Sequence, residues 1–219
     1  MALDNINLHA VTANLLSLLR ELMSEPALRD FNLVGGTALS LLLGHRRSID
    51  IDLFRNSSFN AEELADWLVE SYAIEKCSVE QNSVSGIIRG VKVDLIAHRY
   101  KTIDKITDRE GIRIMGIGDL IAMKLNAIAN RGSKKDFWDC AELLDQHPLD
   151  EQLALFSKKY PQANIWQVQK SLCYFDDAEN EPEPDTLNGQ TWKGVKLLIE
   201  AAARNIFPGN HMPRDSSTN

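Results

Sequence analysis

The segment that most constrains the fold is residues 31 to 54, in which two apolar, strand-like stretches flank a small-residue turn and one short helix-length run. The turn reads Gly-Gly-Thr at residues 35 to 37, and the second stretch carries Asp50 and Asp52. Because side chains alternate along a strand, aspartates two residues apart project from the same face of a sheet. A strand, a glycine turn, a short helix and an acidic strand must therefore pack together in one α/β unit.

The glycine turn is suited to binding an anion. The backbone amides of Gly35, Gly36 and Thr37 can approach an anion closely, because glycine has no side chain and a helix N-terminus adds partial positive charge. We therefore expect a triphosphate to bind there. Ser48, just before the acidic strand, is expected either to contact the triphosphate or to hold the turn.

A third carboxylate completes a set that can bind metal. Asp94 interrupts an otherwise apolar, β-branched run, and an acid in such a place costs free energy unless it is paired or bound to a metal. Together, Asp50, Asp52 and Asp94 can share divalent cations. The alternative is that Asp50 and Asp52 are exposed charges at a strand end and that Asp94 belongs to a single salt bridge.

These residues resemble those of a known superfamily. Gly-Gly-Thr, the Ser-x-Asp-x-Asp element at residues 48 to 52, and Asp94 are similar to the DNA polymerase beta type nucleotidyltransferases. Within that superfamily, Leu-Val-Gly-Gly-Thr-Ala-Leu followed by His45 and Arg46 resembles the AbiEii/AbiGii toxin family. The resemblance implies that His45 and Arg46 lie beside the nucleotide.

A further segment agrees with this resemblance, which spans roughly residues 31 to 145. Lys124 and Arg131 are seven residues apart and so share one face of a helix. The resemblance gives Lys124 a role at the triphosphate and within the catalytic set. It implies that Arg131, Lys135 and Asp136 complete or support the site.

Several of these residues have a structural alternative. Asp136 would also offset the macrodipole at the start of a helix, and His45 could simply close a short helix. Arg131 and Lys134 could be solvated charges at helix ends. Asp139 could bond to the preceding helix end instead of taking part in the site.

The remaining pattern predicts an α/β core followed by a helical region. We expect a mixed β-sheet flanked by helices, the nucleotidyltransferase core, over residues 1 to 116, and a helical region that contributes to the active site over residues 117 to 207. Residues 176 to 190, rich in acids and prolines, are expected to form an exposed loop. Residues 208 to 219 are expected to be a flexible tail.

Composition limits the cell compartment and the class of partner. The net charge of −7 argues against a protein that coats nucleic acid nonspecifically, although a local basic patch is compatible with it. Cys77, Cys140 and Cys173 are odd in number and widely spaced, which favours reduced thiols. The chain has neither a signal-peptide pattern nor a membrane-length apolar run. We expect a cytoplasmic protein with no membrane partner.

The resemblance implies a metal-dependent nucleotidyltransferase toxin that transfers a nucleotide from an NTP to an acceptor. Mg²⁺ is the expected metal, with two ions, and Mn²⁺ is the alternative. The resemblance implies tRNA as a candidate acceptor and a cognate antitoxin protein as a partner. Asp94 could help to take the proton of the acceptor hydroxyl.

Other functions remain open at this point. The acceptor could be a protein or a small molecule such as an antibiotic, and the pocket could belong to a non-catalytic nucleotide-binding module. The basic aromatic segment at residues 98 to 101 could touch an acceptor nucleic acid or be plain surface.

Overall fold

The computed structural model describes residues 6 to 206, so the expected tail lies outside the described residues. In this part of the chain, a mixed sheet of seven strands runs in the order β3-β4-β5-β2-β1-β7-β6. The strands are β1 (Asn32–Val34), β2 (Asp50–Arg55), β3 (Glu75–Glu80), β4 (Ser83–Ile88), β5 (Val91–Ala97), β6 (Thr107–Arg109) and β7 (Ile112–Ile114). The expected α/β class is confirmed.

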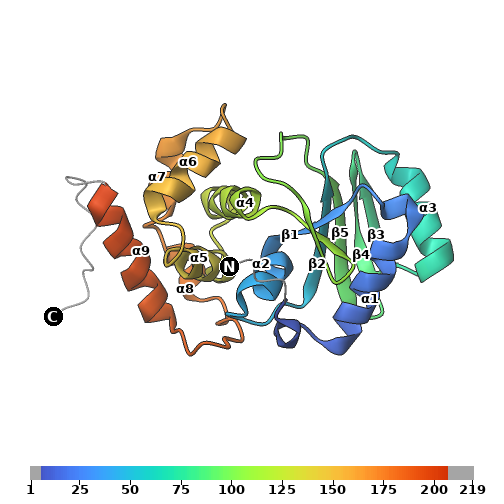
Figure 1. Ribbon diagram of the computed structural model, residues 1–219, viewed down its shortest axis with the longest axis horizontal. Helices are drawn as coiled ribbons and strands as arrows, with labels where there is room; N and C mark the ends of the chain where they lie inside the picture. The colour runs from blue at the N-terminus through green and yellow to red at the C-terminus, as the bar shows by residue number, and fades with distance from the viewer. Residues whose placement is uncertain (1–5, 207–219) are drawn as a thin grey trace.

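Helices cover both faces of this sheet. Figure 1 shows α1 (Ala13–Ser24) and α3 (Ala61–Tyr72) on one face, and α2 (Gly35–Leu43) with α4 (Ile117–Asn130) on the other. The helical region continues beyond α4 with α5 (Lys134–Leu143), α6 (Leu149–Lys159), α7 (Ile165–Ser171), α8 (Asp176–Glu179) and α9 (Trp192–Ile206). Two short 3-10 helices, Leu8–Ala10 and Pro26–Leu28, flank α1.

Local sequence chemistry accounts for several of these boundaries. α3 begins after Asn60, whose side chain accepts a hydrogen bond from the backbone amide of Glu63. α2 ends at Gly44, which has a φ of +68°, a left-handed conformation that glycine adopts without steric cost. The termination at Gly44 lets the chain turn back toward the acidic strand, which begins at Asp50.

The acidic strand β2 lies at the centre of the sheet. It pairs with β1 in antiparallel and with β5 in parallel orientation, and Asp52 lies opposite Val34 on one side and Asp94 on the other. Because paired residues in neighbouring strands point to the same face, this register alone brings two aspartates together.

Two hydrophobic cores follow one another along the chain, and α4 contributes to both. The first core holds the buried strand residues together with α1, and the second holds the aromatic residues of α5, α6 and α9. Ile121 belongs to the first core and Leu125 to the second. One helix thus ties the sheet to the helical region, and the expected division at residue 116 stays a prediction.

The structure departs from the sequence expectations in the acidic segment at residues 176 to 190. The prediction of an exposed loop holds for residues 180 to 190, which are irregular and exposed or half-buried, but the segment begins with α8, and Ala178 is fully buried. Thr186 forms an isolated antiparallel bridge with Arg46, which attaches the segment to the turn before β2. Among residues 6 to 206, no helix is long and apolar enough to cross a membrane.

Candidate active site

A cleft of about 1120 Å³ lies between the face of the sheet at β2 and β5 and the helices α4 and α5. Its sheet wall carries Asp50, Asp52 and Asp94, and its helical wall carries Lys124 and Arg131. These five residues, which the sequence singled out in separate segments, therefore surround one space.

The sheet wall has the arrangement that strand alternation predicts. Asp52 pairs in register with Asp94, and Asp50 pairs with Lys92, so all four side chains lie on one face. Ile51, between the two acids of β2, points the other way and is fully buried. This confirms that Asp50 and Asp52 share a face of the sheet.

Asp52 and Asp94 have few protein partners. Burial and the neighbouring Asp94 carboxylate raise the pKa of Asp52, and its side chain makes no hydrogen bond or ion pair within residues 6 to 206. Asp94 Oδ2 accepts a hydrogen bond from Lys92 Nζ at 2.5 Å, while its Oδ1 is buried without a partner in the same part of the chain. Two neighbouring carboxylates therefore repel one another and keep oxygens without a protein partner in the described part of the chain.

The glycine turn lies against this pair. Gly35 has a φ of +69°, and a Cβ atom there would lie 2.3 Å from Asp52 Oδ2. A Cβ atom on Gly36 would lie 2.4 Å from Arg46 Nη2. Only glycine therefore allows the first turn of α2 to sit between the carboxylate and the guanidinium, with its backbone amides at the cleft.

Thr37 and Ser48 hold the turn from behind. The Thr37 hydroxyl is buried, lies 2.8 Å from Ser48 Oγ, and is hydrogen-bonded to the backbone carbonyl of Asp50. Thr37 lies outside the residues that line the cleft, whereas Ser48 reaches it. Of the two roles expected for Ser48, the structure supplies contacts for holding the turn.

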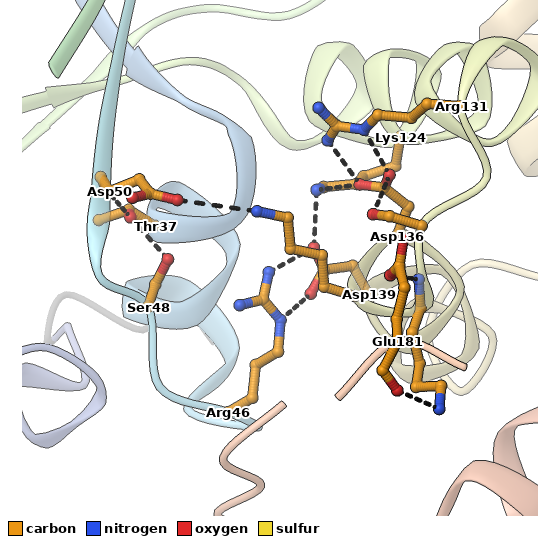
Figure 2. Close-up of polar contacts among 12 residues, drawn as sticks. Thr37, Arg46, Ser48, Asp50, Lys124, Arg131, Asp136, Asp139 and Glu181 are labelled. Atoms are coloured by element: carbon orange, nitrogen blue, oxygen red, sulfur yellow. Dashed lines mark hydrogen bonds and ion pairs between the residues drawn. The ribbon is translucent and has the colours of Figure 1, made fainter. Parts of the chain in front are cut away.

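On the helical wall, Lys124 and Arg131 converge on Asp136 (Figure 2). Lys124 Nζ lies 3.0 Å from Asp136 Oδ1, Arg131 Nε lies 2.8 Å from Asp136 Oδ2, and Ser133 Oγ also lies 2.8 Å from Oδ2. Burial acts to raise the pKa of Asp136, but these cations outweigh it and lower the pKa to about 2. Asp136 thus does more than offset a helix dipole.

Asp139 joins the two halves of the molecule. Its carboxylate accepts hydrogen bonds from Arg46 Nε at 2.6 Å and Arg46 Nη2 at 2.8 Å (Figure 2). It also lies 2.7 Å from His45 Nε2 and 2.8 Å from Lys124 Nζ. The expectation that Asp139 bonds to the preceding helix end is wrong, because Asp139 reaches across to the turn after α2.

The charged groups of this network shift one another's pKa values. Burial acts to raise the pKa of Asp139, but Arg46 and Lys124 hold it well below its usual range. Burial likewise acts to lower the pKa of Lys124, but Asp139 and Asp136 raise it. His45 has a fully buried side chain and lies outside the cleft lining, so the structure gives it a contact with Asp139 and none with the cleft.

Arg47, which is exposed and paired with Asp185, lines the cleft. Three more exposed cations of the cleft are Arg131, Lys135 and Lys92. Their side chains are 58%, 48% and 56% exposed, and Lys135 Nζ lies 3.7 Å from Asp50 Oδ2. Lys134 is different, because it is buried and its Nζ donates to the backbone carbonyls of Glu179 and Glu181. The alternative of a solvated helix end is therefore wrong for Lys134.

Sequence reasoning missed one side of the cleft. Residues 181 to 185 line it, held by a hydrogen bond from the amide of Lys134 to Glu181 at 2.7 Å and by one from the amide of Arg47 to the carbonyl of Asp185 at 2.8 Å. No local pattern predicts this contact, because it joins segments far apart in the chain.

The three aspartates are not gathered into a ready ligand set. Among residues 6 to 206, no group of three or more His, Cys, Asp or Glu side chains is placed to hold a metal ion. Asp94 and Asp50 instead face Lys92 and Lys135.

Solved structures of other proteins share this fold. One solved structure, from H. pylori, is described as an assigned nucleotidyltransferase. It matches with a TM-score of 0.54 and 17% identity, covering 88% of this chain and 91% of that one. The protein JHP933 of Helicobacter pylori matches with a TM-score of 0.52 and 18% identity, covering 88% of each chain. At these identities the likeness establishes the fold alone.

Sequence relatives establish the family. An uncharacterised protein of Aquifex aeolicus (strain VF5) is 33% identical over 173 residues, which are 76% of this chain and 84% of that protein. The family model of the nucleotidyl transferase AbiEii toxin, a type IV toxin–antitoxin system, matches residues 17–104 and 87–212. Because this match extends over most of the chain, the protein belongs to the AbiEii nucleotidyltransferase toxin family.

Proposed function

We propose that this protein transfers a nucleotide from an NTP to a hydroxyl group of an RNA acceptor with the help of Mg²⁺, and that it does so as the toxin of a toxin–antitoxin pair. The observation that carries the proposal is the register of Asp52 opposite Asp94 at the centre of the cleft, beside the glycine turn. The name of the family supports a partner antitoxin. The earlier resemblance suggests tRNA as the RNA class.

The aspartates present in the cleft fit a divalent cation. Asp52 and Asp94 repel one another, as the raised pKa of Asp52 reflects together with its burial, and Asp94 Oδ1 lacks a partner within the described residues. Asp50, Asp52 and Asp94 would hold the metal once the contacts of Asp50 and Asp94 with lysines open. When bound, Mg²⁺ neutralises charge on the phosphates and makes the attacking hydroxyl more acidic; Mn²⁺ offers the same chemistry.

The remaining roles in the proposed reaction are triphosphate binding, orientation of the cationic wall and acceptance of the acceptor proton. The backbone amides of Gly35 and Gly36, with Arg131 and Lys135, would bind the triphosphate, because these groups face the cleft and carry positive charge. Lys124 is fixed by two carboxylates and would orient this cationic wall. The spare Asp94 oxygen would accept the proton of the acceptor hydroxyl.

A transfer assay tests this proposal. Purified protein with Mg²⁺ and each α-labelled NTP is incubated with total cellular RNA or protein, beside Asp50→Asn and the matched variant Asp66→Asn. Asp66 is an exposed aspartate of α3, outside the residues that line the cleft.

We expect label in RNA from the parent protein and from Asp66→Asn, and none from folded Asp50→Asn. Label in protein would support the second acceptor class. Retained labelling by Asp50→Asn would refute the assigned site, and NTP binding without any labelled product would support a small-molecule acceptor or a non-catalytic module.

A further inference from the structure

We infer that the end of the cleft beyond Asp52 and Asp94 is a binding site for a nucleobase of the acceptor, built by Phe54, His98 and Tyr160. This inference deepens the proposed function and rests on it for the direction of transfer. The site and its ring-binding chemistry rest on separate observations.

Both walls of the cleft change character in the same direction. Along β2 the cleft-facing residues run from Asp50 through Asp52 to Phe54, and along β5 from Lys92 through Asp94 to Ile96 and His98. The backbone amide of His98 donates to the carbonyl of Arg55 at 2.7 Å, which extends the pairing of the two strands by one residue. The sheet wall is therefore charged at one end and apolar at the other.

The helical wall shows the same change. Leu120 and Met123 line the cleft near the start of α4, whereas Lys124 and Arg131 follow toward its end. The start of α4 lies at the apolar end, because Asp119 bonds to the loop that follows His98. One end of the cleft is therefore cationic, and the other is apolar and aromatic.

The aromatic rings at the apolar end form a continuous group. Ring centroids of Phe54 and His98 lie 5.4 Å apart, and those of His98 and Tyr160 lie 5.8 Å apart. His98 Nε2 lies 3.0 Å from the Tyr160 hydroxyl. Tyr100 packs on both His98 and Tyr160, with centroid distances of 4.7 Å to each. Phe54 and His98 are half-buried, so part of each ring stays open to the cleft.

This wall is fixed by buried charge. The Asp119 carboxylate accepts hydrogen bonds from the backbone amides of Ile103 and Asp104, and it lies 2.6 Å from Lys159 Nζ. Lys159 directly precedes Tyr160, so one buried ion pair anchors both the loop and the tyrosine. The rings are thus held in place before any ligand arrives, which reduces the entropy cost of binding.

The end of the cleft also carries no charge at neutral pH. Burial and the nearby Lys159 lower the pKa of His98 to about 4. A neutral, partly open aromatic surface favours a planar, uncharged ring, and nucleobases stack on such surfaces whatever their sequence. A phosphate or an acidic peptide would find no cation there to pair with among the cleft-lining residues described above.

The direction of transfer assigns this ring to the acceptor. In phosphoryl-type transfer the attacking oxygen and the leaving group lie roughly in line. If the triphosphate lies at the cationic end, then the leaving pyrophosphate departs toward that end. The attacking hydroxyl must come from the opposite side of Asp52 and Asp94, where the aromatic residues are.

Direct binding tests the inference without turnover. The probe is a short fluorescent oligoribonucleotide, compared with the same chain lacking its terminal bases, and binding is followed by fluorescence anisotropy at low salt. The variants are Phe54→Ala, Phe54→Leu, which keeps apolar bulk, and Phe54→Tyr, which keeps the ring. Phe59→Ala is the matched control, because Phe59 is also half-buried but lies in a different pocket.

We expect Phe54→Ala and Phe54→Leu to weaken binding of the complete oligonucleotide roughly tenfold to a hundredfold. Binding of the oligonucleotide that lacks its terminal bases, and binding of NTP, should not change. Phe54→Tyr and Phe59→Ala should bind both oligonucleotides as the parent protein does. An equal loss for both oligonucleotides, or no loss, would overturn the inference.

Two further results would also overturn it. Weaker NTP binding by Phe54→Ala would mean that the ring belongs to the NTP, and labelling of protein alone in the transfer assay would remove RNA as the acceptor. Loss of transfer in Asp50→Asn with unchanged oligonucleotide binding by Phe54→Ala would uphold the proposed function while refuting this site.

Discussion

Two pairs of aspartates, one on the sheet wall of the cleft and one buried on α5, have opposite surroundings. Asp52 and Asp94 on the sheet have few partners, and the pKa of Asp52 is raised by burial and by Asp94. Asp136 and Asp139 on α5 have several cationic partners, which lower the pKa of both against the effect of burial. The negative charge of the first pair is only partly balanced by cationic side chains, whereas that of the second pair is balanced by Lys124, Arg131 and Arg46.

The difference shows how a fold can separate stability from chemistry. Substitution of a buried carboxylate that has its partners in place lowers the free energy of unfolding, because it leaves the other charges buried and unpaired. A carboxylate pair with few partners costs stability, because its two charges repel one another.

The largest effect should follow the loss of Asp139. Asp139→Ala leaves His45, Arg46 and Lys124 without their shared carboxylate, so the free energy of unfolding should fall by about 3–5 kcal/mol. Denaturant unfolding measures this change. Asp145→Ala, at an exposed position in the segment after α5, should stay within about 0.5 kcal/mol of the parent. Similar values for the two variants would show that the network contributes nothing.

Acid should destabilise the aromatic end. The pKa of His98 falls from an ordinary value of 6.5 to about 4 in the folded protein, so the unfolded chain binds more protons between these values. Stability should therefore fall as pH drops from about 6.5 to about 4, by on the order of 2 kcal/mol after allowance for the partly exposed ring.

Thermal melting across this pH range measures the effect. In His98→Gln the dependence should be shallower, because Gln does not titrate. Lys159 and Asp119, the charged groups that act on the ring, remain in that variant. An unchanged slope would assign the acid sensitivity to other groups.

Removal of a charge from the sheet pair should stabilise the fold. Asp52→Asn takes away a carboxylate whose pKa is raised, so its ionised form costs stability at neutral pH and less as pH falls toward its ordinary range. The free energy of unfolding at neutral pH should rise, while nucleotide transfer is lost. Chemical denaturation and the labelling assay check the two halves, and a destabilised variant would contradict the comparison.

The smallest effect concerns Lys92, which holds Asp94 Oδ2 at 2.5 Å. Lys92→Met removes a cation that competes with the metal, so half-maximal transfer should need several-fold less Mg²⁺, consistent with about 1 kcal/mol for a solvated charge pair. A Mg²⁺ titration of transfer measures this shift. Lys193→Met, on the exposed face of α9, should leave the titration unchanged. A higher Mg²⁺ requirement would mean that Lys92 supports the site.

Much of the sheet wall and of α4 could be predicted because it depends on local periodicity. The two-residue spacing of Asp50 and Asp52 fixes a shared strand face, and the seven-residue spacing of Lys124 and Arg131 fixes a shared helix face. Asn60 predicts the start of α3, because its side chain can accept a hydrogen bond from a backbone amide of the first helical turn. These patterns hold whatever the rest of the chain does.

The partners of these residues could not be predicted in the same way. Asp139 meets Arg46 across 93 residues of sequence, His98 meets Tyr160 across 62, and residues 181 to 185 close one side of the cleft. No periodic signal links such segments. Even Lys92, two residues from Asp94, could have been seen in the strand alternation, but its contact with Asp94 depends on a side-chain conformation.

The sequence by itself determined the family, the α/β class and the faces on which the acids and cations lie, because repeat distances along a helix or strand are set by the backbone. Only the tertiary structure decided which charged side chains pair with one another and which have few partners. The pairing depends on burial and on long-range contacts, since Asp139 is stabilised beside Arg46 and Lys124, whereas Asp52 is costly beside the Asp94 carboxylate.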